Sequence, residues 1–207
     1  ACCHNIDKLG NELYGNSIDK KIFETLGWSQ TFDASGKNYV IEPKNSYKIS
    51  EYLVLNNENS FGYSDVKYRQ TIIKRFEFSS KFQSNAVICF NELDKSMRFF
   101  TKGAPEKILL YCKQDSLPTD YNEKLLQHTK NGFRVLACAT KLIDKSKEIE
   151  TMTREDFEKE LTFLGFVIFR NKLKNDTKQI IENLNLSGCR LIMATADNPF
   201  TSISVAK

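Results

Sequence analysis

The segment Lys102–Glu106, with the sequence KGAPE, has the residue types best suited to phosphate binding. Gly103 lets another group approach the backbone closely, and Pro105 is tolerated in the first turn of a helix. The start of a helix offers free N–H groups and a positive potential, and Lys102 adds a point charge. The segment therefore predicts a phosphate-binding turn, with an ordinary strand-to-helix turn and a solvated lysine as the alternative.

Three further side chains are suited to a nucleotide. Phe78 stands before a polar Ser-Ser pair, where an aromatic ring could stack on a flat base, although plain core packing is the alternative. Arg134 follows Gly132 and could clamp a phosphate with two parallel hydrogen bonds, or form a surface ion pair. Asp19 lies in the first turn of a predicted helix, where it could accept from the amine of a base or simply favour the helix dipole.

Another candidate motif is Thr195-Ala196-Asp197-Asn198, which follows a short apolar stretch. If that stretch is a parallel strand, the motif lies at the sheet edge where ligands bind in open α/β folds. A carboxylate there can hold magnesium or order a phosphate-bound water. A helix N-cap at Asp197 or Asn198 is the competing interpretation.

These motifs need supporting elements, and hydrophobic periodicity predicts them up to residue 160. A helix is expected over 17–26, where Asn16 or Ser17 can cap it and Gly27 can end it. A polar loop is expected over 56–65, and two helices are expected over 105–112 and 120–130. The predicted strands cover residues 47–55, 70–78, 86–92, 97–102 and 133–142.

After Thr153 the pattern changes to that of a partial Rossmann-like βαβ segment. Thr153 and Asp156 form a capping-box-like start for a short helix. Residues 161–169 are nearly all apolar, which predicts a strand buried on both faces. A helix over 176–186 with Ile180, Ile181 and Leu184 inward, a strand over 190–195 and a helix from Pro199 follow. We therefore expect one domain over 1–160 and part of a second over 161–207.

Composition excludes several classes of protein. Of the 207 residues, 41% are hydrophobic and 27% charged, which excludes wholesale disorder, collagen and coiled-coil rods. A net charge of +4 is too small to argue for nucleic acid. No apolar stretch approaches the roughly 20 residues of a membrane span. Six cysteines without a C-x-x-C pair favour a reducing compartment and no metal site, and Ala1 in place of Met suggests a piece of a longer protein.

Taken in order, the motifs resemble the nucleotide-binding domain of a P-type ATPase followed by the start of its phosphorylation domain. The segments that carry the resemblance are GNSIDKKIFETLGW, RFEFSSKFQSNAVIC, KGAPEKI, GFRVLACA, FLGFVIFRNKLK and MATADNPFTSISVAK. The first segment, Gln83 after FSS, and NKLK are similar to type V pumps of the B branch. The resemblance implies an α/β fold, with an antiparallel sheet flanked by helices and then a haloacid-dehalogenase-like segment.

The resemblance also implies roles for individual residues, with ATP and Mg²⁺ as cofactors. It stacks adenine on Phe78, places Asp19 near the edge of the adenine, and has Gln83 line the same pocket. It makes Lys102 and Gly103 the floor of that pocket and directs Arg134 toward the phosphates. Thr195 and Asp197 would be catalytic and would face the transferred phosphoryl group and its magnesium.

This sequence departs from the family pattern at two places. It has Ala196 where the family has glycine, and it has Ser-Asn-Ala at residues 84–86 where the family branch has R-M-S. The D-K-T-G-T aspartate and the G-D-G-x-N-D motif are absent from the chain. We therefore expect it to bind ATP without turnover, at the cytosolic face of a membrane. Its partners would be the phosphorylation, actuator and transmembrane domains of the same polypeptide, and the transported substrate, a cation or polyamine, is not given by the sequence.

Two other functions remain open. A soluble haloacid-dehalogenase-like phosphotransferase requires an acidic nucleophile after a first parallel strand, and the sequence shows none. A non-enzymatic interaction module would use the aromatic residues only as core. The ATP hypothesis differs from both in one geometric expectation, namely that the ring of Phe78 and the ammonium of Lys102 converge on one purine triphosphate.

Overall fold

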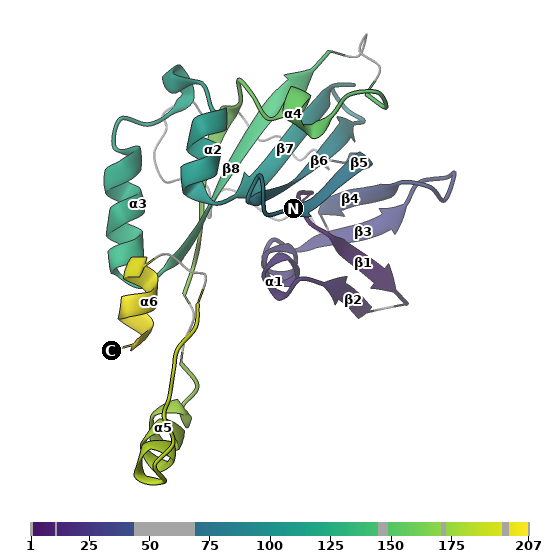
Figure 1. The fold of residues 1–207 in the computed structure, drawn as a ribbon. Coiled ribbons are helices and arrows are strands. Elements are labelled where there is room, and N and C mark those ends of the chain that lie inside the picture. The colour runs from purple at the N-terminus through teal and green to yellow at the C-terminus, as the bar shows by residue number, and fades with distance from the viewer. Residues whose placement is uncertain are drawn as a thin grey trace.

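The centre of the protein is a seven-stranded sheet in which every neighbouring pair is antiparallel (Figure 1). The computed structural model describes residues 2–10, 12–43, 69–144, 149–170, 173–195 and 199–206. The expected α/β class, with an antiparallel sheet flanked by helices, is confirmed. The strands, in sheet order, are β3 (Trp28–Phe32), β4 (Tyr39–Pro43), β5 (Gln70–Ser79), β6 (Ser84–Asn91), β7 (Met97–Gly103), β8 (Arg134–Ile143) and β9 (Thr162–Phe169).

A small antiparallel hairpin of β1 (Ile6–Leu9) and β2 (Glu12–Gly15) precedes the sheet. Its strands are too short for their pattern to be recognised, and the sequence did not predict them. The predicted strand over 47–55 and loop over 56–65 lie outside the described residues.

The helices begin and end close to their predicted positions. Asn16 caps the first helix by accepting a hydrogen bond from the backbone N–H of Ile18 at 2.9 Å. The predicted capping box of Thr153 and Asp156 is present. The helices are α1 (Ser17–Thr25), α2 (Pro105–Tyr111), α3 (Tyr121–Lys130), α4 (Arg154–Phe157), α5 (Thr177–Leu186) and α6 (Pro199–Ala206), with a short 3₁₀ helix over Gln114–Ser116. None of the helices in the described part of the chain combines the length and apolar character of a membrane span.

Two hydrophobic cores form because successive residues of a strand point to opposite faces of the sheet. On β6, Ile88 packs with Ile108 of α2 and Phe157 of α4. The preceding residue, Val87, packs on the other face with Phe23 of α1 and Ile6 of β1. All six side chains are almost fully buried, and each such burial contributes about 1.5–3 kcal/mol. Helices α2 and α4 therefore cover one face, and α1 with β1 covers the other (Figure 1).

The strand predicted over 161–169 forms as β9, but its surroundings differ from the prediction. It pairs antiparallel with β8 in the same sheet, instead of starting a parallel sheet. It is also not buried on both faces, since Leu164 is 56% and Ile168 is 42% exposed. The physical reason is that Phe163 and Phe166 of β9 pack against the core, whereas no described element covers Leu164 and Ile168. The domain division at residue 160 remains a prediction.

Two further predictions for 161–207 are wrong. Residues 190–195 form no strand, because a strand needs a hydrogen-bonding neighbour and none of the described strands lies beside them. Helix α5 forms, but Ile180, Ile181 and Leu184 are 49%, 44% and 38% exposed instead of inward. Figure 1 shows α5 projecting away from the sheet, so no described element covers its apolar face. Helix α6 lies beside α3 (Figure 1).

Candidate functional site

A pocket of about 560 Å³ lies at the end of the sheet where the β5–β6 turn, the start of α2 and the start of β8 meet. This volume falls within the range of small-molecule sites, about 300–1,000 Å³. Phe78 lines it from the end of β5, Gln83 lines it from the turn, and Arg134 and Leu136 line it from β8. The antiparallel order of β5 to β8 brings these residues together from positions far apart in the sequence.

Phe78 is the exposed aromatic residue of this pocket. Its side chain is 66% exposed, although it follows a β5 segment rich in apolar residues. The pairing of β5 with β6 shifts register between Phe76 and Ser79, and such a bulge redirects a side chain at the end of a strand. Plain core packing is therefore excluded for Phe78, and its ring is available to stack on a flat ligand.

Gln83 closes the turn in a left-handed conformation with φ of 50°. Its N–H donates to the carbonyl of Ser79 at 2.7 Å, and its own carbonyl accepts from the N–H of Ala104 at 2.9 Å. The turn thus rests directly on the end of β7. A Cβ atom at Gly103 would lie 2.4 Å from the Gln83 oxygen and 2.5 Å from the Ser84 Cβ, so only glycine permits this approach.

Lys102 and Asp19 do not line the pocket, but they lie together. Their side chains form an ion pair, and each is only 8% exposed. The Lys102 ammonium also donates to the carbonyl of Cys3 at 2.9 Å, and Asp19 accepts from the N–H of Asn5 at 3.4 Å. Because a buried ammonium needs a counter-charge, the carboxylate from α1 holds Lys102 on the α1 face of the sheet.

The expected convergence of Phe78 and Lys102 on one ligand is therefore not seen in this structure. Phe78, Gln83 and Arg134 gather around the pocket, while Lys102 and Asp19 form a separate buried cluster. Gly103 lies between the two groups. It follows Lys102 in the chain, and its backbone packs closely against Gln83 in the turn.

The thiol beside Lys102 is neutral at pH 7. Burial raises the pKa of Cys3 to about 12, although the charge of Lys102 partly opposes this effect. The thiol donates to the carbonyl of Asn85 at 3.3 Å. Cys3 packs against the hydrophobic core on the α1 face, and a reactive thiolate is not expected there.

The predicted catalytic pair is only partly described. Thr195 is exposed, and Asp197 lies outside the described residues. Within the described ranges, no group of three or more His, Cys, Asp or Glu side chains could hold a metal ion. The Mg²⁺ that the resemblance implies therefore stays a prediction.

Sequence reasoning missed Leu136 of the pocket and the Arg154–Glu158 pair beside it. Leu136 could have been found, because strand alternation places it on the same face as Arg134. Arg154 and Glu158 stand four residues apart, which suggests an ordinary surface pair, and nothing in the sequence indicates that both are buried.

Comparison with known proteins then decides the family. The family described as P-type ATPase, cytoplasmic domain N, matches residues 52–176. The chain belongs to this family. The seven-stranded antiparallel sheet is therefore the sheet of a P-type ATPase N domain, and the pocket lies at one end of it.

Individual relatives of this N domain are similar over nearly the whole chain. The vacuolar cation-transporting ATPase YPK9 of Saccharomyces cerevisiae is 36% identical over 99% of the chain. The probable cation-transporting ATPase 13A4 of Gallus gallus is 35% identical over 99%, and the polyamine-transporting ATPase 13A3 of Mus musculus is 30% identical over 100%. The chain spans only 15%, 16% and 18% of the length of these three relatives.

Proposed function

We propose that this N domain binds ATP in the pocket at the end of the sheet and presents the γ-phosphate to an aspartate outside the chain. The observation that carries the proposal is the exposed ring of Phe78, which lines one pocket with the guanidinium-bearing side chain of Arg134. The ring stacks on adenine, and the Gln83 amide hydrogen-bonds the nucleotide. Arg134 binds the phosphate chain, where its planar group can form two parallel hydrogen bonds.

Lys102 and Asp19 belong to the same proposal through a conformational step. For the ammonium to reach the phosphates and the carboxylate to reach the amine of adenine, their ion pair must open when ATP binds. The triphosphate replaces Asp19 as the counter-charge of Lys102, so that the ammonium stays neutralised throughout. Gly103 keeps the turn with Gln83 close enough for this exchange.

The remaining parts of the proposal concern the whole transporter. The part of 161–207 that follows β9 would begin the phosphorylation domain, in which Thr195 and Asp197 face the transferred phosphoryl group. Because phosphoryl transfer depends on positioning and charge neutralisation, this chain alone would bind ATP without hydrolysing it. The names of the relatives support a cation or polyamine as the transported substrate, and sequence motifs support a type V pump of the B branch at the cytosolic face of a membrane.

Titration of the ¹⁵N-labelled chain with ATP, followed by NMR, tests this function. We expect amide shifts at Phe78, Gln83, Gly103 and Arg134. Phe78→Ala should weaken binding by about 5- to 150-fold, since stacking of one base contributes about 1–3 kcal/mol. Phe32→Ala is the matched control, because Phe32 is 53% exposed on β3 and does not line the pocket.

The absence of shifts at millimolar ATP would refute the proposal and favour a non-enzymatic interaction module. Equal weakening by Phe78→Ala and Phe32→Ala would place the nucleotide elsewhere. Hydrolysis of a phosphate ester by the isolated chain would favour the soluble phosphotransferase instead.

A further inference from the structure

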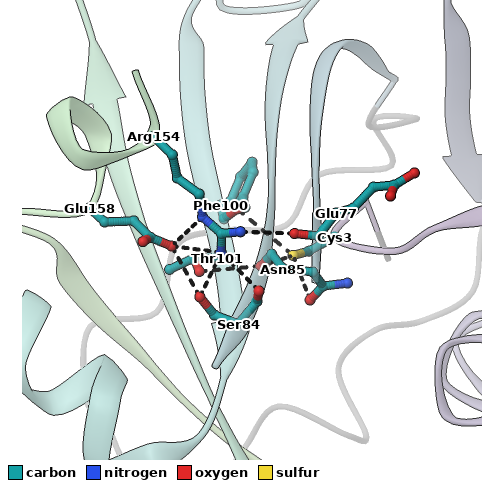
Figure 2. Close-up of polar contacts among 8 residues, drawn as sticks. All are labelled: Cys3, Glu77, Ser84, Asn85, Phe100, Thr101, Arg154 and Glu158. Atoms are coloured by element: carbon teal, nitrogen blue, oxygen red, sulfur yellow. Dashed lines mark hydrogen bonds and ion pairs between the residues drawn. The ribbon is translucent and has the colours of Figure 1, made fainter. Parts of the chain in front are cut away.

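A buried arginine in α4, Arg154, donates hydrogen bonds to both strands that flank the β5–β6 turn (Figure 2). Arg154 Nη1 donates to the carbonyl of Glu77 at 2.8 Å. Its Nη2 donates to the carbonyl of Ser84 at 2.8 Å and to the Ser84 hydroxyl at 2.7 Å. The side chain is 9% exposed, so these hydrogen bonds form almost without competition from water.

Glu158 completes the cluster and supplies its counter-charge. Its Oε1 accepts from Arg154 Nε at 3.0 Å and Nη2 at 2.9 Å. The same oxygen accepts from the Ser84 hydroxyl at 3.0 Å, and the Glu158 side chain is 1% exposed. Both charged side chains and the hydroxyl therefore hold one another in a single arrangement (Figure 2).

The carbonyl groups that Arg154 binds lie on either side of the ligand-facing residues. Glu77 immediately precedes Phe78, and Ser84 immediately follows Gln83. The guanidinium also lies 4.6 Å from the ring centre of Phe82, inside the same turn. One planar group thus fixes both ends and the middle of the turn, which a lysine ammonium could not do with the same geometry.

The energetics indicate what this cluster contributes. A buried ion pair adds little net stability, because desolvation offsets the attraction between the charges. An exposed pair in the same region, Lys81 with Glu155 at 2.7 Å, also adds little. What Arg154 supplies is therefore geometry, since three hydrogen bonds to the turn restrict where Phe78 and Gln83 can lie.

We propose that Arg154 and Glu158 are positioning residues for the nucleotide, acting on it through the turn that carries Phe78 and Gln83. This inference rests on the proposed ATP binding. Neither residue lines the pocket, so their effect on affinity passes through the placement of Phe78 and Gln83, and mainly through that of the stacking ring. Loss of the guanidinium fork leaves the pocket residues unchanged and makes the turn mobile.

The test compares Arg154→Lys with the unchanged chain of 207 residues. Heteronuclear NOE values of the amides from 79 to 83, without ATP, should fall in the variant. ATP binding should weaken about tenfold, the factor that corresponds to one hydrogen bond to a charged group. In a Phe78→Ala background the same change should weaken binding less than about twofold, because the ring through which Arg154 acts is gone.

Thr140→Val is the control for general destabilisation. It removes the buried hydrogen bond from Thr140 Oγ1 to the Phe99 carbonyl, 2.9 Å long and remote from the pocket, and should leave ATP affinity unchanged. If Arg154→Lys does not fold, Glu158→Gln provides the same comparison, since it removes the counter-charge and keeps an oxygen acceptor.

Each outcome separates this inference from the proposed function. If the unchanged chain binds ATP and Arg154→Lys binds it equally well, the positioning role is wrong and the proposed function stands. If the two effects on affinity add fully in the double variant, Arg154 acts by a route other than Phe78, and the inference is also wrong. If the unchanged chain does not bind ATP, the proposed function fails, and the positioning role fails with it.

Discussion

The ion pair of Asp19 and Lys102 allows the sharpest prediction about stability. Asp19→Asn removes the carboxylate charge and keeps the size of the side chain and an oxygen acceptor. Lys102 would then be a buried cation with the carbonyl of Cys3, at 2.9 Å, as its remaining described partner. Its side chain is 8% exposed, so water cannot replace the lost charge.

The expected loss follows from this burial. Breaking a buried pair by removing one partner costs about 3–5 kcal/mol. In Asp19→Asn the ammonium keeps the Cys3 carbonyl and gains the asparagine oxygen as acceptors. We therefore expect a loss at the lower end of this range, about 3 kcal/mol. Lys102→Met should cost a similar amount, because it leaves the Asp19 carboxylate buried with only the N–H of Asn5 at 3.4 Å among its described contacts. The double variant should be more stable than the sum predicts by about 2 kcal/mol, since no unpaired charge remains.

Urea unfolding at pH 7, followed by circular dichroism, measures all four proteins, and the slope m checks that the exposed surface is comparable. Raising the salt concentration should change the result little, because buried pairs are screened weakly. Single-variant losses below about 1 kcal/mol, the range of exposed pairs, would refute the argument. Full additivity in the double variant would refute it equally.

Three further changes test other parts of the fold. Gly103→Ala should destabilise the chain by about 2 kcal/mol through overpacking against Gln83 and should shift the Gln83 amide resonance; an unshifted amide contradicts this. Burial, followed by the charge of Arg75, lowers the pKa of His4 from 6.5 to about 3, so only the unfolded chain gains this proton near pH 5. The free energy of unfolding should therefore fall by about 2 kcal/mol more between pH 7 and pH 5 in the unchanged chain than in His4→Gln. An equal pH dependence in the two proteins would contradict this. Thr153→Ala removes the capping box and should cost about 1 kcal/mol in thermal unfolding, whereas an unchanged midpoint would contradict this.

Local features of the fold could be predicted from the sequence because they depend on neighbouring residues. The helix that begins at Pro105 and the cap at Asn16 are fixed by groups within one helical turn. The strands on either side of the 79–84 turn follow from their apolar pattern. These elements carry Phe78 and Gln83, and for that reason part of the candidate site could be predicted correctly.

Interactions between distant segments could not be predicted in this way. Lys102 and Asp19 are 83 residues apart, and no periodic pattern indicates that each is the partner of the other. Helix α5 illustrates a different limit, since its amphipathic pattern predicts a helix and also a covered face. Its Ile180 and Ile181 are nevertheless exposed, because cover depends on tertiary neighbours that a helical period does not specify.

The KGAPE segment shows how one short motif divides between two faces of a sheet. Strand alternation directs Lys102 toward α1, and the next residue, Gly103, lies opposite Ser84. The missing side chain of Gly103 leaves room for Ser84, whose hydroxyl contacts both Arg154 and Glu158. A methyl group there would displace Ser84 and with it the cluster that holds the turn. Gly103→Ala and Arg154→Lys should therefore loosen the same amides, from 79 to 83, although the two residues lie on different elements.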